Sequence, residues 1–102
     1  MHPEPQADGT WIIRIDPNWP GFAGHFPGDA LVPAGLMIDW ALSVIGPSVT
    51  LLRARFTAPL RPGDVAVMTR TEMRIELHCR TLLVAALHFS TEPNPAEPLP
   101  LH

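Results

Sequence analysis

The chain has no lysine, and all seven of its positively charged side chains are arginine. Its formal net charge is −3 and only 17% of its residues are charged, so it lacks the basic patch that nucleic-acid binding requires. The single cysteine, Cys79, excludes a disulfide within the chain. No apolar run reaches the roughly 18 residues of a membrane span and no charged-then-apolar leader begins the chain, which predicts a soluble, cytoplasmic protein.

The length of 102 residues suits a single domain with a modest hydrophobic core. Residues 1–9, rich in proline and polar side chains, are predicted to form a flexible segment, and residues 91–102 a proline-rich disordered tail. A nearly all-apolar segment starts at Pro33 and ends at Gly46-Pro47, which predicts a buried central helix. Strand patterns cover residues 10–16, 49–60, 65–73, 74–79 and 82–90. This order predicts an α+β fold over residues 10–90, with an antiparallel sheet around one helix.

Two polar residues stand where packing alone would not place them. His25 lies in the loop Gly24-His25-Phe26-Pro27-Gly28, inside a long stretch rich in glycine and proline, and ordered loops of that length are usually functional. Asp39 interrupts the apolar helix. Imidazole titrates near neutral pH and suits a general base, whereas apolar neighbours favour the protonated form of an aspartate and suit a proton donor. The two residues therefore predict an acid–base pair.

The residues around this pair resemble the signature of β-hydroxyacyl-ACP dehydratases of the FabA/FabZ type, which have the hotdog fold, a curved antiparallel sheet around one long central helix. The resemblance covers about residues 10–90 and is closest to the small dehydratases of aryl polyene pathways. Two alanines depart from the pattern, since family members usually carry proline at Ala30 and glycine at Ala34. The residues that carry the resemblance are Gly24 to Asp29, Val32-Pro33, Leu36, Asp39-Trp40-Ala41 and the turn Arg61-Pro62-Gly63-Asp64.

The resemblance implies a (3R)-3-hydroxyacyl-ACP dehydratase that needs no metal or redox cofactor and takes its substrate on acyl carrier protein. His25 would remove the C2 proton and Asp39 would protonate the departing C3 hydroxyl. The free N–H groups of Ala34 and Gly35 at the positive end of the helix would face the thioester carbonyl. In such enzymes the histidine of one subunit works with the acid of the other, which implies an obligate homodimer with shared active sites.

Two further features of the helix concern the substrate. Phe26, Leu36 and Trp40 are predicted from their placement to line the acyl channel. The helical spacing puts small residues, Gly35 and Ser43, on the same narrow strip as Asp39. Such a strip allows another backbone or a ligand to approach the carboxylate closely.

Two alternative functions stay open. A hotdog acyl thioesterase would also place a carboxylate on the central helix, but it would not need His25. A non-catalytic thioester-binding subunit of a hotdog heterodimer is compatible with the departures at Ala30 and Ala34. Acyl-chain length and pathway are not determined by these residues.

The remaining charged residues have ordinary interpretations. Arg53, Arg55 and Arg61 are predicted to be solvated, with contacts to an acidic carrier protein or to the phosphopantetheine phosphate as the alternative. The other histidines have no spacing typical of metal ligands and are interpreted as structural or surface residues: His2, His78, His88 and His102.

Overall fold

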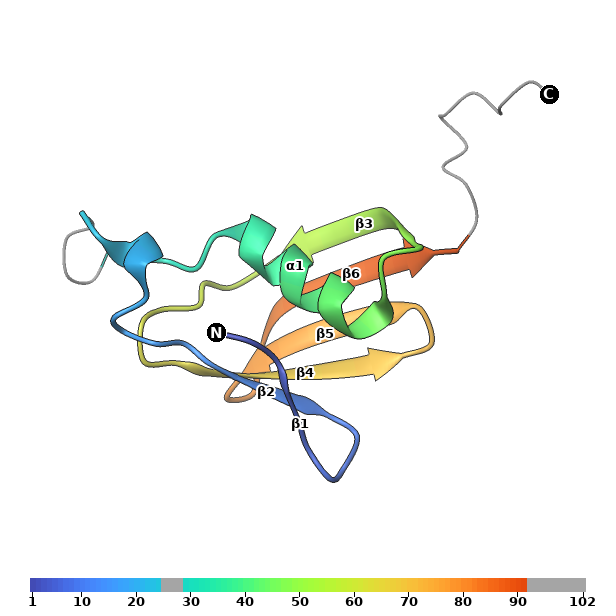
Figure 1. The fold of residues 1–102 in the computed structure, drawn as a ribbon, viewed down its shortest axis with the longest axis horizontal. Helices are drawn as coiled ribbons and strands as arrows, with labels where there is room; N and C mark the ends of the chain where they lie inside the picture. Colours follow the sequence, from blue (N-terminus) through green and yellow to red (C-terminus); the bar gives the residue numbers. More distant parts are fainter. Residues whose placement is uncertain (25–28, 92–102) are drawn as a thin grey trace, which may run out of the picture.

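The computed structural model describes residues 1–24 and 29–91, in which one helix lies across one face of a six-stranded antiparallel sheet (Figure 1). This confirms the predicted α+β class. The elements in chain order are β1 (Glu4–Pro5), β2 (Trp11–Arg14), the 3-10 helix η1 (Pro20–Phe22), α1 (Ala34–Ile45), β3 (Thr50–Phe56), β4 (Val65–Thr71), β5 (Arg74–Cys79) and β6 (Leu82–Ser90).

The strand order across the sheet is β1-β2-β4-β5-β6-β3. Strands β4, β5 and β6 form a meander of two hairpins, in which Met68 faces Leu77 and Leu77 faces Ala85. β2 extends the meander on one side and β3 on the other. The connection from β2 to β4 therefore carries the helix over the sheet and contributes the opposite edge strand.

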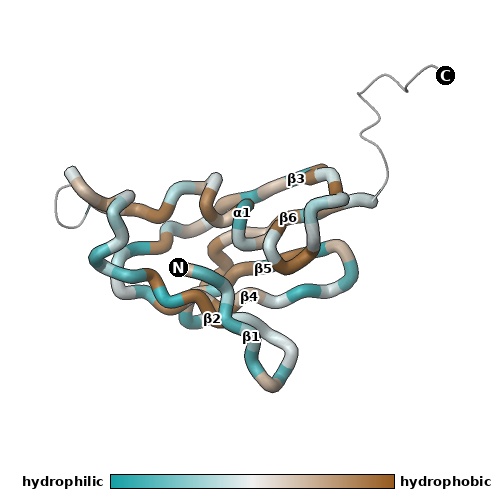
Figure 2. Tube along the Cα trace, in the orientation of Figure 1, coloured by the Kyte–Doolittle hydropathy of each residue, from teal (hydrophilic) through white to brown (hydrophobic). Residues whose placement is uncertain are grey.

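The core lies between the sheet and α1. Alternate side chains of the central strands face the helix, as the period of two in a strand requires, and Figure 2 shows apolar residues recurring along these strands. Side chains at most 1% exposed include Ile13, Ile15, Leu60, Met68, Ile75, Leu77, Val84 and Leu87.

In the described part of the chain, no helix has the length and apolarity needed to span a bilayer.

The predicted and observed boundaries agree best in the second half of the chain. β5 and β6 have the predicted bounds, whereas β2, β3 and β4 are shorter than predicted. Within residues 1–9, for which flexibility was predicted, Glu4 and Pro5 pair with Ile12 and Trp11 to form β1. The predicted tail lies outside the described residues from position 92 onward.

The helix differs from its prediction in one respect. Met37, Trp40 and Ala41 are buried against the sheet, but Asp39 is exposed, as is Gly35 one turn before it. The predicted central helix is confirmed, but in the single chain it is buried on one side only, because the sheet covers only one side of α1. The opposite side is open.

Candidate active site

The first turn of α1 presents backbone donors. Pro33 is the N-cap, and its carbonyl accepts the N–H groups of Leu36 at 3.1 Å and Met37 at 3.4 Å. Among the described residues, no acceptor reaches the N–H groups of Ala34 and Gly35, and Pro33 has no side chain that could cap them. These are the two donors predicted to face a thioester carbonyl, and the helix dipole adds partial positive charge there.

Asp39 lies one turn further along the same open side. Gly35, Asp39 and Ser43 are all exposed, and a Cβ added at Gly35 would meet nothing within 4 Å. The Ser43 hydroxyl turns back to donate to the Trp40 carbonyl at 2.7 Å, which keeps the strip small and flat. Within the described residues, no hydrogen bond or ion pair engages the Asp39 carboxylate. The burial predicted for Asp39 is therefore absent in the single chain.

The loop that carries the predicted base is described on both sides but not at its centre. His25 and Phe26 lie outside the described residues. Before them, the ring of Trp19 meets that of Phe22 edge to face, with centroids 5.0 Å apart, and Phe22 is buried in the core. After them, the Val32 N–H donates to the Leu60 carbonyl at 2.9 Å, which anchors the approach to α1.

A cavity of about 350 Å³ opens beside the start of α1. Ala34 and Met37 contribute from the helix, and the end of β3 contributes Phe56. The other lining residues are Leu31, Val32, Thr57, Ala58 and Pro59. The methyl group of Ala34, one of the two departures from the dehydratase pattern, therefore lines a mostly apolar cavity next to the free N–H groups.

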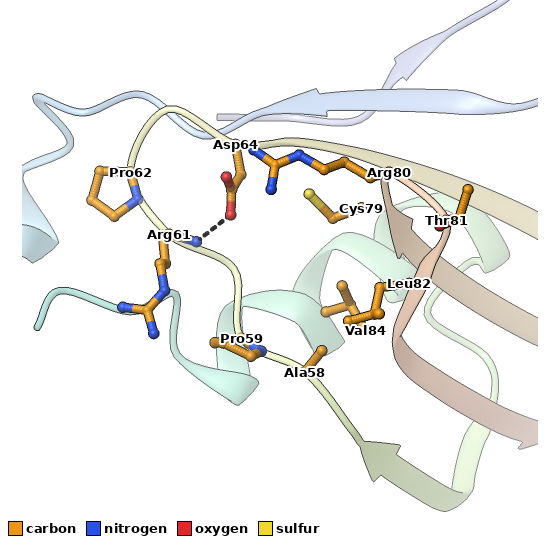
Figure 3. Close-up of a pocket in the computed structure, with 10 residues that line it drawn as sticks. All are labelled: Ala58, Pro59, Arg61, Pro62, Asp64, Cys79, Arg80, Thr81, Leu82 and Val84. Atoms are coloured by element: carbon orange, nitrogen blue, oxygen red, sulfur yellow. Dashed lines mark hydrogen bonds between the residues drawn. The ribbon is translucent and has the colours of Figure 1, made fainter. Parts of the chain in front are cut away.

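A larger cavity, of about 500 Å³, shares Ala58 and Pro59 with the first (Figure 3). The thiol of Cys79 points into it, Arg61 also lines it, and the Arg80 side chain extends toward Asp64. Its rim is fixed by the predicted turn, in which the Asp64 carboxylate accepts the Arg61 N–H at 2.8 Å.

Two of the three predicted channel residues, Leu36 and Trp40, belong to the described part of the chain. Leu36 is half-buried against the core, and Trp40 is only 2% exposed, with its indole N–H donating to the Met1 carbonyl at 3.3 Å. Neither residue lines either of these two cavities. Sequence reasoning missed Phe56 and Thr57, because no local pattern shows that the end of β3 reaches the start of a helix more than 20 residues earlier.

The fold and the open helix start together define a hotdog-fold protein. One solved structure similar to this chain is the dehydratase heterocomplex ApeI:P from Xenorhabdus doucetiae, with a TM-score of 0.60, 20% identity and coverage of 78% of this chain and 84% of that one. Another is an uncharacterised protein from Erwinia carotovora subsp. atroseptica, with a TM-score of 0.50, 20% identity and coverage of 79% and 81%. At these identities the two structures establish the fold alone.

The sequence defines the family. Residues 2–92 match the family model described as ApeI-like, ApeI dehydratase, and the chain belongs to this family. A relative from Syntrophotalea carbinolica, a 3-hydroxyacyl-[acyl-carrier-protein] dehydratase FabZ, is 31% identical over 78 residues, which cover 61% of this chain and 52% of the relative. The chain thus spans about half the length of that curated relative. Membership confirms the resemblance to FabA/FabZ-like and aryl polyene dehydratases.

Proposed function

We propose that this chain is a (3R)-3-hydroxyacyl-[acyl-carrier-protein] dehydratase of aryl polyene or fatty acid type biosynthesis, working in the cytoplasm. The observation that carries the proposal is the open side of α1, where no acceptor from residues 1–24 or 29–91 reaches the N–H groups of Ala34 and Gly35, one turn before Asp39. An oxyanion site and a carboxylate held on one rigid helix supply two of the three groups that the elimination needs. His25 is proposed as the third.

The proposed reaction balances with these groups alone. His25 takes the C2 proton, and the electrons of that C–H bond form the C2–C3 double bond. Asp39 gives a proton to the C3 hydroxyl, which leaves as water. During the step, negative charge on the thioester oxygen is stabilised by the N–H groups of Ala34 and Gly35. The products are the trans-2-enoyl thioester and water.

The proposed site contains two hotdog chains. Asp39 is solvent-exposed in the single chain, whereas a proton donor in such a reaction works best where water is excluded. A second chain lying over the Gly35–Asp39–Ser43 strip would exclude water and could bring its own histidine loop to Asp39. The description of the Xenorhabdus structure as a dehydratase heterocomplex supports an assembly of this kind.

Hydration of a short trans-2-enoyl thioester, run in the reverse direction and followed by loss of enoyl absorbance, tests the proposal. The substrate is offered on carrier protein and on CoA to wild type, His25→Ala, Asp39→Asn and the control Ser43→Ala. We expect the first two variants to lose at least about 10²-fold in turnover and the control to keep it. Assembly state is measured for each variant by light scattering, so that loss of chemistry is separated from loss of assembly.

A non-catalytic thioester-binding subunit is the second candidate. It is favoured by Ala34, which lines the cavity beside the helix start at a position where family members usually have glycine. Wild type that is well folded and assembled but hydrates neither thioester would contradict the dehydratase proposal and support this candidate. Release of free thiol from an acyl thioester would instead support the thioesterase alternative.

A further inference from the structure

The larger cavity, of about 500 Å³, has no part in the proposed reaction. None of the catalytic, oxyanion or channel residues predicted within residues 1–24 and 29–91 lines it. Its volume falls within the roughly 300–1,000 Å³ that is usual for small-molecule sites in proteins. The chemistry of its lining therefore indicates which ligand, other than the acyl substrate, would fit there.

The lining of this cavity is cationic on balance. Arg61 and Arg80 contribute two guanidinium groups and Asp64 one carboxylate, in a chain whose formal net charge is −3. The Asp64 carboxylate already accepts the Arg61 N–H at 2.8 Å. No ion pair or hydrogen bond with another described residue engages the guanidinium of Arg80. That guanidinium is therefore available to an oxyanion, which it binds through two parallel hydrogen bonds.

The backbone at Arg80 is a second, independent observation. Cys79 pairs with Leu82, so Arg80 and Thr81 form a two-residue hairpin loop, and Arg80 has a φ of 59°. Glycine or asparagine adopts this left-handed conformation more readily than arginine, which makes an arginine here costly. Glu72 has a similar φ of 55° in the other hairpin of the meander, but it lines neither cavity. What distinguishes Arg80 is that its side chain lies against a cavity.

The rest of the lining is mostly apolar. Leu82 is 59% exposed, whereas Val84 is buried, and Pro59 and Pro62 add rigid apolar surface. Figure 3 shows these side chains around the same space as the thiol of Cys79. An exposed leucine near an available guanidinium favours a ligand that is charged at one end and apolar at the other.

We infer that the larger cavity binds a small organic oxyanion, a carboxylate or phosphate joined to a short apolar group. Arg80 binds the oxyanion, Arg61 adds positive charge, and Leu82 contacts the apolar group. The inference goes beyond the proposed dehydration and does not depend on it, because Asp39 and the N–H groups of Ala34 and Gly35 lie outside this cavity.

Protection of Cys79 from alkylation tests the inference on the full chain. Cys79 is the only cysteine, and its thiol points into the cavity, so it reports directly on occupancy. The chain reacts with the neutral reagent iodoacetamide at constant pH and ionic strength, and mass spectrometry gives the alkylation rate. The added probes are hexanoate, hexyl phosphate and neutral 1-hexanol. We expect at least one anion to protect Cys79 saturably, at a concentration at least about 10-fold below that required of 1-hexanol, because its hydrogen bonds to a guanidinium are charge-assisted.

Two glycine variants locate the binding. Arg80→Gly and the control Glu72→Gly both replace a side chain at positive φ, so each should keep or raise the Tm. Only Arg80→Gly should weaken protection, by at least about 10-fold. Arg80→Asn, which also tolerates positive φ, replaces Arg80→Gly if that variant does not fold.

Four results would overturn the inference: no protection by either anion, equal protection by 1-hexanol, undiminished protection in the Arg80 variant, or an equal loss in Glu72→Gly. Protection by only one of the two anions supports the inference and identifies the oxyanion as carboxylate or phosphate. No thioester is present in these measurements. A chain that is protected but does not hydrate enoyl thioesters would therefore contradict the dehydratase proposal alone.

Discussion

Gly35→Ala should raise the stability of the single chain while lowering its activity. Alanine is a better helix former than glycine, and a Cβ at position 35 would meet nothing within 4 Å, so the substitution creates no clash within the chain. Near the helix start we expect a gain of about 0.5 kcal/mol in the free energy of unfolding, which corresponds to a rise in Tm of about 2–4 °C for a domain of this size.

The same methyl group lies on the side of α1 where a second chain or a substrate is proposed to approach. A displacement of about 1 Å at a reacting centre costs on the order of 10² in rate, so we expect a loss of that size in enoyl thioester hydration. Thermal unfolding is measured at low protein concentration and hydration beside it, with Ser43→Ala as the control that adds no bulk to the same strip. A Gly35→Ala chain that is stabilised and fully active would refute close approach at this face.

Three other substitutions test separate parts of the structure. Leu77→Ala removes a fully buried side chain and should cost about 2–5 kcal/mol in urea unfolding; a cost below about 1 kcal/mol would be inconsistent with its place in the core. Gly21→Ala would drive a Cβ into the Trp19 ring, and by disturbing the segment that leads to His25 it should lower the rate of enoyl thioester hydration. Unchanged Trp19 fluorescence and an unchanged hydration rate would contradict this prediction. The hydroxyl and N–H of Thr10 lower the pKa of Asp8 by binding its carboxylate, so Thr10→Val should raise that pKa toward its ordinary value in an NMR titration. The stability that the Asp8–Thr10 contact adds in wild type is present at neutral pH and is lost as the pH falls through the lowered pKa of Asp8. An Asp8 titration curve that does not move in Thr10→Val would count against this contact.

The sequence predicted the strands best where turn signals bound a clear alternation. β5 and β6 match because short turns separate them from their neighbours. β3 was predicted to run to residue 60, and it ends at Phe56, after which the N–H groups of Thr57 and Ala58 both donate to the Val84 carbonyl, at 2.9 and 3.4 Å, and break the one-to-one register of the ladder. β1 has no pattern of its own, since two residues in a polar segment form a strand only through pairing with β2.

The candidate site was predictable in its residue types but not in its surroundings. The open N–H groups at Ala34 and Gly35 follow from Pro33 at the helix start, which the sequence displays directly. The exposure of Asp39 could not be predicted, because the sequence of an apolar helix does not show whether its apolar residues are covered by the chain's own sheet or by a second chain. The role of His25 remains a prediction.

The connection between β2 and β4 has a consequence for how this fold forms and varies. Every candidate catalytic and channel residue lies in that connection, whereas the β4–β5–β6 meander contains none of them. The meander is built from contacts between neighbours in the sequence, whose loop-closure cost is small, whereas the connection brings together residues far apart in the sequence at a larger entropic cost. We therefore expect that substitutions at exposed positions of the connection can alter the chemistry while the meander stays intact.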